Sequence, residues 1–158
     1  MTQRHLKTAV PNLKSLNNHQ ILKNMKTDIK TLSSFLAAAV WADGEYDEFE
    51  KEFVGDLAEE LELPKLAETL EKEIKATEKM SEEELANNLE AAAKKVDAGE
   101  KEGILSLCLQ MMCADAFLAQ DEVDNFFAFA DILGVEEEAA SAILDEFVEE
   151  EEDLIIEQ

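Results

Sequence analysis

The chain has 158 residues, of which 46% are hydrophobic, and its formal net charge at pH 7 is −24. This length and apolar content suffice for one domain with a hydrophobic core. The negative charge excludes proteins that bind nucleic-acid phosphates, because they need a basic surface, and it favours cations or basic proteins as partners.

The charge is unevenly distributed along the chain. Residues 1–30 contain six Lys or Arg and one acidic residue, whereas residues 31–158 contain eight Lys or Arg and 37 acidic residues. We therefore expect a basic N-terminal arm or short helices over 1–30, a helical domain over 31–150 and an acidic tail over 151–158. The arm could contact the acidic body, an anionic membrane surface or neither.

The first strongly patterned element follows the arm. A polar helix over 19–30 is compatible with the sequence, and the apolar residues within 32–40 then recur with the spacing of an amphipathic helix. We expect this helix to end near Trp41 or Ala42, because Gly44 can adopt the left-handed conformation that terminates helices.

Capping signatures mark the starts of later helices. Asp47 is followed three residues later by Glu50, and Ser81 is followed in the same way by Glu84. In each pair the two side chains can bond to each other's backbone N–H groups, which predicts a helix start. Pro64 predicts a further start, because proline is tolerated in the first turn of a helix.

Helices fill the rest of the chain. The helices predicted after the first cover 47–61, 64–77, 82–96, 102–115, 120–133 and 136–150. Gly99 and Gly134 are the predicted stops of two of them, and the stretch 102–115 is apolar on nearly all sides, as at the centre of a bundle. No stretch alternates as a strand does. The sequence therefore predicts an all-α fold, a single compact bundle of about six to eight helices.

One acidic phrase occurs twice. Residues 39–63 read AVWADGEYDEFEKEFVGDLAEELEL, and 72 positions later residues 111–135 read MMCADAFLAQDEVDNFFAFADILGV. This shift places Ala42-Asp43 on Ala114-Asp115 and Glu50 on Glu122. The repeat predicts two pseudo-symmetric helix–turn–helix units.

Carboxylates are crowded into both repeated turns. The first turn carries Asp43, Glu45, Asp47 and Glu50, and the second carries Asp115, Asp121, Glu122 and Asp124. An Asp at the end of a helix is disfavoured by the partial negative charge there, so its presence requires compensation. Either the carboxylates accept hydrogen bonds from exposed N–H groups at the start of the next helix, or they bind a divalent cation.

The cation hypothesis has a definite set of ligands. Asp43 and Asp115 would be the principal ligands, with Glu50 and Glu122 as ligands or as orienting groups; Glu45, Asp47 and Asp121 are less favoured. If the two turns approach each other about a pseudo-twofold axis, they could share one ion, which could be Ca²⁺, Mg²⁺, Mn²⁺ or Zn²⁺.

Familiar metal and catalytic motifs are absent from the sequence. The first turn does not match an EF-hand, because Glu48 and Val54 stand where that loop needs Gly and Glu. His5 and His19 lie in the arm with no cysteine nearby. We find no phosphate-binding Gly-rich loop, no GxSxG and no HExxH, so we expect the protein not to be an enzyme.

Targeting and redox features point to the cytoplasm. The N-terminus lacks the apolar stretch of a signal peptide, and the best apolar stretch, 104–119, is broken by Gln110 and Asp115. Cys108 and Cys113 match no metal or redox spacing. We expect a cytoplasmic protein whose cysteines are buried free thiols.

Two stretches resemble the TerB family of bacterial tellurite-resistance proteins. They are AAAVWADGEYDEFE at 37–50 and CADAFLAQDEVDNFFAFADILGV at 113–135. The family pattern is an apolar helix ending in Ala/Ser-Asp-Gly followed by a Glu in the next helix. Asp43-Gly44 with Glu50 matches it, whereas the second copy has Ala116 in place of the glycine. The resemblance implies an all-α pseudo-symmetric bundle, acidic residues that bind divalent metal, and action with partner proteins in resistance to tellurite and other stresses.

Two main functional hypotheses follow. The first is a non-enzymatic, TerB-like stress-response protein whose divalent-cation load at the two turns changes partner binding. The second is a metal-independent acidic protein-interaction module, a scaffold or co-chaperone-like protein, in which the Asp/Glu pairs serve only as helix caps. A third reading of the extreme charge is a mimic of nucleic acid that binds a basic protein.

Overall fold

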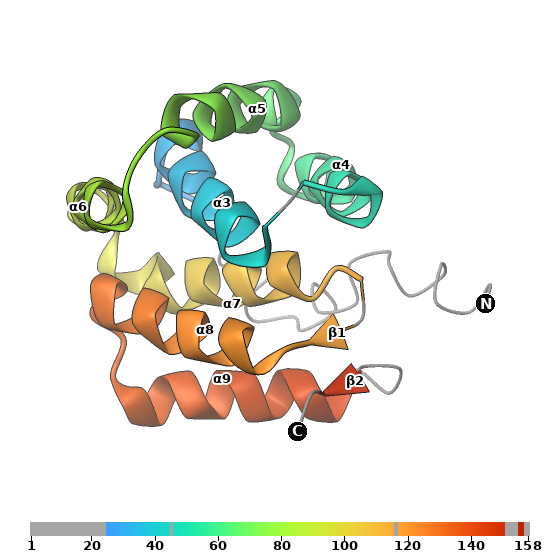
Figure 1. Ribbon diagram of the computed structural model, residues 1–158, viewed down its shortest axis with the longest axis vertical. Coiled ribbons are helices and arrows are strands. Elements are labelled where there is room, and N and C mark those ends of the chain that lie inside the picture. Colours follow the sequence, from blue (N-terminus) through green and yellow to red (C-terminus); the bar gives the residue numbers. More distant parts are fainter. Residues whose placement is uncertain (1–24, 45, 116, 151–154, 157–158) are drawn as a thin grey trace.

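The computed structural model describes residues 25–44, 46–115, 117–150 and 155–156, with the backbone alone at Asp43, Ile155 and Ile156 (Figure 1). These residues form seven α-helices, which confirms the predicted all-α fold. The helices bury one continuous apolar core. None of the helices in the described ranges is long and apolar enough to cross a membrane.

Helix α3 (Ile29–Asp43) lies at the centre, between α5 and α7 (Figure 1). Its residues from 31 to 40 are all buried, so it is enclosed on every side. Gly44 ends it with φ of 101°, and its N–H donates to the Val40 carbonyl at 2.8 Å. The predicted glycine stop is therefore confirmed.

The residues before α3 are not helical. The polar helix considered over 19–30 is described from residue 25 onward; residues 25–28 are non-helical, so that prediction is wrong there, and residues 29 and 30 belong to α3. The buried Glu100 carboxylate accepts hydrogen bonds from the backbone N–H groups of Lys26 at 2.6 Å and Thr27 at 3.0 Å. Asp28 then caps α3 by accepting from the Thr31 N–H at 2.8 Å.

Helices α4 (Glu48–Leu61) and α5 (Leu66–Thr77) complete the first half of the bundle. Pro64 lies two residues before α5 and not in its first turn. The reason is that Glu62 ends α4 in the left-handed conformation, φ 57°, and the Leu63 N–H returns to the Ala58 carbonyl at 2.8 Å. Pro64 and Lys65 therefore lie in the turn between the two helices, and α5 begins only at Leu66.

Helix α6 (Glu82–Ala93) and the short 3₁₀ helix η2 (Ala98–Glu100) connect the two halves. The capping box predicted at the start of α6 is present, with Ser81 and Glu84 bonded to each other's backbone. The predicted stop at Gly99 is wrong, because α6 ends at Ala93. Gly99 instead lies within η2.

The second half contains α7 (Lys101–Met112), α8 (Gln120–Leu133) and α9 (Glu137–Glu150), stacked one below another in Figure 1. Residues 103–112 of α7 are all buried, as its apolar sequence predicts. Helix α7 ends at Met112, three residues before the predicted end, so Asp115 lies in the following turn. Gly134 ends α8 with φ of 83°, as predicted.

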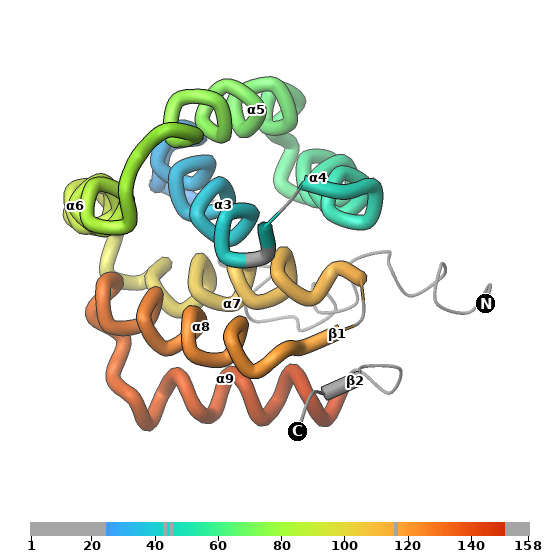
Figure 2. Tube along the Cα trace, viewed as in Figure 1, coloured from blue at the N-terminus to red at the C-terminus, as the bar shows by residue number. Residues whose placement is uncertain are grey.

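The repeat in the sequence extends over three helices in each half. Adding 72 to the bounds of α4 gives the bounds of α8, and the left-handed residues that follow, Glu62 and Gly134, are related by the same shift. Helices α5 and α9 also correspond to within a residue. Figure 2 shows the two halves, α3–α5 and α7–α9, joined through α6.

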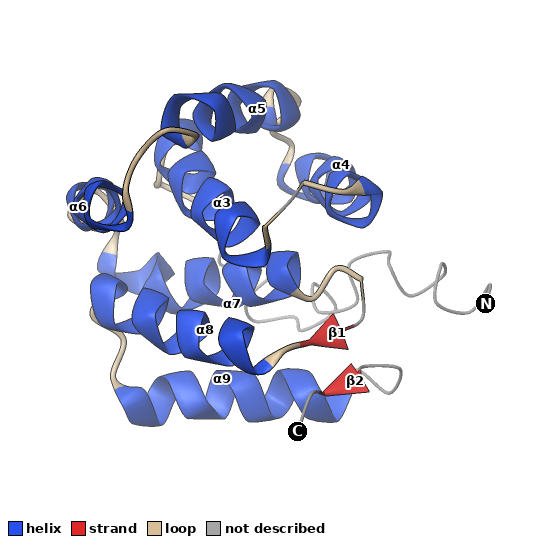
Figure 3. Cartoon of the chain, viewed as in Figure 1, coloured by secondary structure: helices blue, strands red, loops and turns tan. Residues whose placement is uncertain are grey.

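Two short strands lie at the edge of the bundle (Figure 3). Strand β1 (Phe117–Leu118) pairs in parallel with β2 (Ile155–Ile156), in the register Phe117 with Ile155. The second strand lies within the stretch that the charge pattern marks as an acidic tail. Two residues are too few to show strand alternation, so the sequence pattern gave no sign of either strand.

Candidate functional site

The first repeated turn is a complete capping box. Asp47 Oδ1 accepts from the Glu50 N–H at 2.9 Å, and Glu50 Oε1 accepts from the Asp47 N–H at 3.0 Å. Glu50 is only 2% exposed. The buried carboxylate thus serves a backbone donor at the start of α4, as the capping hypothesis predicts. The side chain of Asp43 and the whole of Glu45 lie outside the described residues.

The second repeated turn is built differently. Glu122 Oε1 accepts from the Ala119 N–H at 2.9 Å, which matches Glu50, and Glu122 is 5% exposed. The position equivalent to Asp47 is Ala119, whose side chain has no acceptor, so only half of the box is formed. Asp115 Oδ1 accepts from the Phe117 N–H at 3.1 Å. Ala116, which replaces the glycine of the first turn, lies outside the described residues.

The predicted cation ligands whose side chains are described make hydrogen bonds to nearby backbone N–H groups or lie exposed. Glu50 and Glu122 each bond to the start of their own helix, Asp115 bonds within its turn, and Asp121 is exposed in the first turn of α8. Among the described residues, no three Asp, Glu, His or Cys side chains gather closely enough to hold a metal ion. His5 and His19 lie outside those residues.

Tyr46 adds an aromatic group to the first turn. The Lys51 ammonium lies 5.5 Å from the centre of its ring, which is within the range of a cation–π contact. Burial raises the pKa of Tyr46 to about 12, and the nearby Glu71 and Glu50 carboxylates act in the same direction. The phenol therefore stays neutral in this turn at physiological pH.

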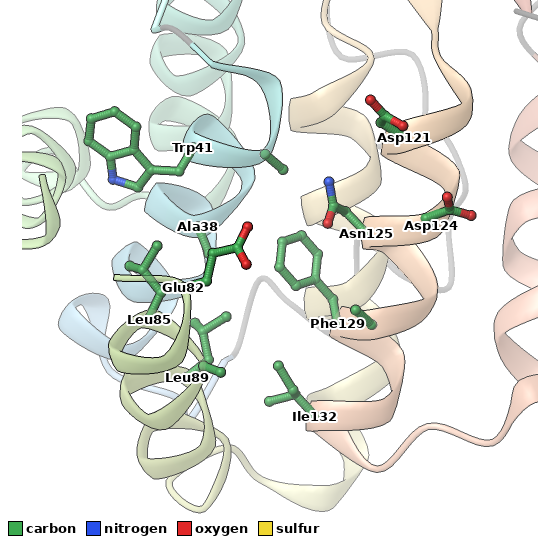
Figure 4. Close-up of a pocket in the computed structure, with 13 residues that line it drawn as sticks. Ala38, Trp41, Glu82, Leu85, Leu89, Asp121, Asp124, Asn125, Phe129 and Ile132 are labelled. Carbon is green, nitrogen blue, oxygen red and sulfur yellow. The ribbon is translucent and has the colours of Figure 1, made fainter. Parts of the chain in front are cut away.

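A groove of about 550 Å³ lies between α3, α6 and α8 (Figure 4). On α6, Glu82 is followed toward the C-terminus by Leu85 and Leu89. On α8, Asp121 and Asp124 are followed by Phe129 and Ile132. On each of these two walls, acidic residues near the N-terminal end of the helix are followed by apolar residues toward its C-terminal end.

The apolar part of the groove is partly open. Leu85 and Ile132 are half-buried, although both are apolar, whereas Leu89 and Phe129 are buried. Figure 4 shows the Leu89 and Ile132 side chains on opposite walls, extending into the space between α6 and α8. A ligand could therefore remove further apolar surface from water here.

The α3 wall of the groove is fixed by a polar network. Trp41, the single tryptophan, donates from Nε1 to Thr77 Oγ1 at 2.8 Å, and that hydroxyl donates to the Glu73 carbonyl at 2.9 Å. The buried Glu73 carboxylate accepts from Ser34 at 3.1 Å and from Lys30 at 3.1 Å. These bonds hold α3 against α5 and orient the indole.

Among the described residues, no cationic side chain forms an ion pair with the carboxylates of the groove. Glu82, Asp121 and Asp124 are exposed, and no ion pair among the described residues involves them. Asp124 accepts a hydrogen bond from the Gln120 amide at 3.3 Å. No described lining residue is Lys or Arg. A basic ligand would therefore meet negative charge that the described residues leave uncompensated.

Sequence reasoning found only part of this groove. The sequence places Asp121 and Asp124 together in the second repeated turn, but no pattern connects Glu82 with them. Leu85 and Leu89 fall within the helix predicted over 82–96, and the sequence does not indicate which helix they lie beside. The missing information is the placement of α6 beside α8, which no local pattern contains.

The cysteines do not contribute a site. Cys108 and Cys113 are free and buried, as predicted. Burial raises the pKa of Cys108 to about 12, so its thiol is unreactive in the folded protein.

Comparison of the chain with protein-family models, with curated proteins and with solved structures finds no match.

Proposed function

We propose that this protein is a non-enzymatic, metal-independent interaction module that binds basic protein partners. The observation that carries the proposal is the groove between α3, α6 and α8, where exposed carboxylates without ion-pair partners among the described residues border a partly open apolar surface. The net charge of −24 adds a long-range attraction for such partners. The caps formed by Glu50 and Glu122 support a stabilising role for the repeated turns that needs no ion.

The proposal is tested by measuring association with cationic and anionic peptides of equal length, at 20 mM and 300 mM salt, with EDTA or with added Mg²⁺ and Ca²⁺. We expect saturable binding of cationic peptides alone, with a Kd that increases with salt and does not change with chelator. Binding that requires a divalent ion, or no binding of any cationic peptide at low salt, would refute it.

A second candidate is a cytoplasmic, TerB-like protein of tellurite resistance or stress response that binds a divalent cation at the repeated turns. The favouring observation is that both turns carry a buried Glu at the equivalent position, Glu50 and Glu122. Each also has a second carboxylate in its sequence neighbourhood, Asp47 in one and Asp115 in the other.

This candidate is tested by titrating the chelated protein with Ca²⁺, Mg²⁺, Mn²⁺ and Zn²⁺ while recording Trp41 fluorescence, heat and melting temperature. Saturable binding that raises the melting temperature and is lost in Asp43→Asn/Asp115→Asn would support it. Weak, unsaturable responses that survive both substitutions would contradict the cation site and leave the interaction module as the remaining candidate. Growth on tellurite of cells that express the chain tests the resistance role.

A further inference from the structure

We infer that the groove between α3, α6 and α8 binds one basic amphipathic helix of a partner protein. The inference rests on the proposed function and adds to it the binding surface and the chemistry of the partner. It concerns a surface separate from the caps formed by Glu50 and Glu122, which face the starts of their own helices.

The apolar part of the groove requires apolar side chains from the partner. Leu85 and Ile132 are half-buried and still offer apolar surface to a partner, whereas Leu89 and Phe129 are already buried. Ala128, which is exposed on the same face of α8, allows a partner backbone to approach closely. A helix that presents an apolar stripe can fill such a groove in the helix-in-groove mode.

The charged part requires basic side chains. Glu82 and Asp121 lie in the first turns of α6 and α8, and Asp124 follows in α8, before the apolar residues of each wall. A partner helix that places its apolar stripe over Phe129 and Ile132 therefore brings its next turns toward Asp121. Lys or Arg there would meet carboxylates that have no ion pair among the described residues.

The dimensions set the length of the partner segment. At about 1.5 Å per residue, α8 extends about 16 Å from Asp121 to Ile132, which corresponds to about three helical turns. We therefore expect apolar side chains at positions i, i+3 or i+4, and i+7, with Lys or Arg concentrated at one end. We place a separate basic protein here and not a second copy of this chain, because the net charge of −24 on each copy disfavours their association.

The test uses the full chain and three synthetic peptides of about 16 residues without tryptophan. The probe is an amphipathic helix with a Leu stripe and Lys at one end. The first control has the same composition in an order that destroys the stripe, and the second replaces every Lys by Glu. Binding is followed by calorimetry and by fluorescence of Trp41, which lines the groove, and sedimentation checks that the protein alone is a monomer.

Two matched double variants locate the binding. Asp121→Lys/Asp124→Lys reverses charge at the groove, and Glu146→Lys/Glu149→Lys reverses the same number of exposed charges, at the same spacing, on α9. We expect the probe to bind about tenfold or more tightly than either control peptide, and the groove variant to weaken it about tenfold or more, with little effect of the α9 variant. Ile132→Ala should weaken binding without altering its salt dependence.

The outcomes separate this inference from the proposed function. If the scrambled peptide binds as well as the probe, or both charge variants weaken binding equally, the groove inference is overturned while a general affinity for basic partners stands. If no cationic peptide binds at all, both fail. A protein that forms dimers through the groove, detected as a monomer–dimer equilibrium shifted by Ile132→Ala, would also overturn the inference.

Discussion

Position 119 offers a direct test of the capping role of the repeated turns. Asp47 caps α4 through its side chain, but the equivalent residue in α8 is Ala119, which has no side-chain acceptor, and the Glu122 N–H donates to the Ala119 carbonyl at 3.0 Å. The backbone of Ala119 (φ −84°, ψ 158°) is close to that of Ser81 (φ −72°, ψ 169°). Ser81 caps α6 by accepting from the Glu84 N–H at 3.1 Å. A serine at 119 should therefore complete the missing cap.

The expected size follows from known N-cap substitutions. Replacing an alanine N-cap by serine is worth about 1 kcal/mol, which for a chain of this length shifts the melting temperature by about 2–4 °C. We expect Ala119→Ser to raise the melting temperature by that amount and Asp47→Ala to lower it similarly. The double variant should lie near the wild type, because the two caps are on different helices and their effects should add.

The measurements are thermal and urea unfolding followed by far-ultraviolet circular dichroism. Ala91→Ser, at an exposed position inside α6, is the control, and it should cost a few tenths of a kcal/mol because serine is a poorer helix former than alanine. Serine adds no charge, so the comparison does not depend on any bound cation. If Ala119→Ser leaves stability unchanged while Asp47→Ala lowers it, the equivalence of the two turns as caps is wrong.

Four further changes have defined outcomes. Glu62→Gly should raise the free energy of unfolding by about 1 kcal/mol, because Glu62 has φ of 57° at a position where the other half of the bundle has glycine. A lower free energy of unfolding, measured in urea, would contradict this. Thr77→Val should cost about 1 kcal/mol and change the emission of Trp41, whose indole N–H loses its acceptor, and an unchanged spectrum would exclude that bond in solution. Glu100→Ala should cost about 2–4 kcal/mol in urea unfolding, because the buried Thr27 N–H and the part-buried Lys26 N–H lose a charged acceptor. A loss below 1 kcal/mol would show that water replaces it. Cys108 should resist iodoacetamide at pH 8 in the native protein and react in urea, because burial and a pKa raised to about 12 keep its thiol protonated. Mass spectrometry measures the labelling, and labelling of the native protein would mean that α7 opens readily.

The features that the sequence predicted well are those with a local cause. The boxes at Asp47 and Ser81 and the stops at Gly44 and Gly134 each depend on residues within one turn, and all four are present. The repeat could also be recognised, because equivalent turns need similar residues. Its extension to three helices per half became visible only from the helix bounds.

The features that were missed depend on residues far apart in the chain. Glu100 bonds to the backbone of residues 26 and 27, which precede it by 74 and 73 positions, so local helix propensity contains no information about these bonds. Strands β1 and β2 are likewise separated by most of the second half of the chain. The groove forms only because α3, α6 and α8 lie beside one another, and the sequence pattern of each helix alone does not show this. The cation hypothesis stays a prediction.

The burial of most of α7 has a consequence for proteolytic cleavage of the chain. Residues 103–112 are buried on all sides, in contact with α3 of the first half as well as with α8 and α9 of its own. A fragment containing α3–α5 alone would expose the surface of α3 that α7 covers, so neither half has the core of an independent domain. The exposed Lys94 and Lys95 lie between α6 and η2, outside any helix. Cleavage there should leave two fragments that stay associated, and the protein is suited to fragment complementation, with each half folding on the other.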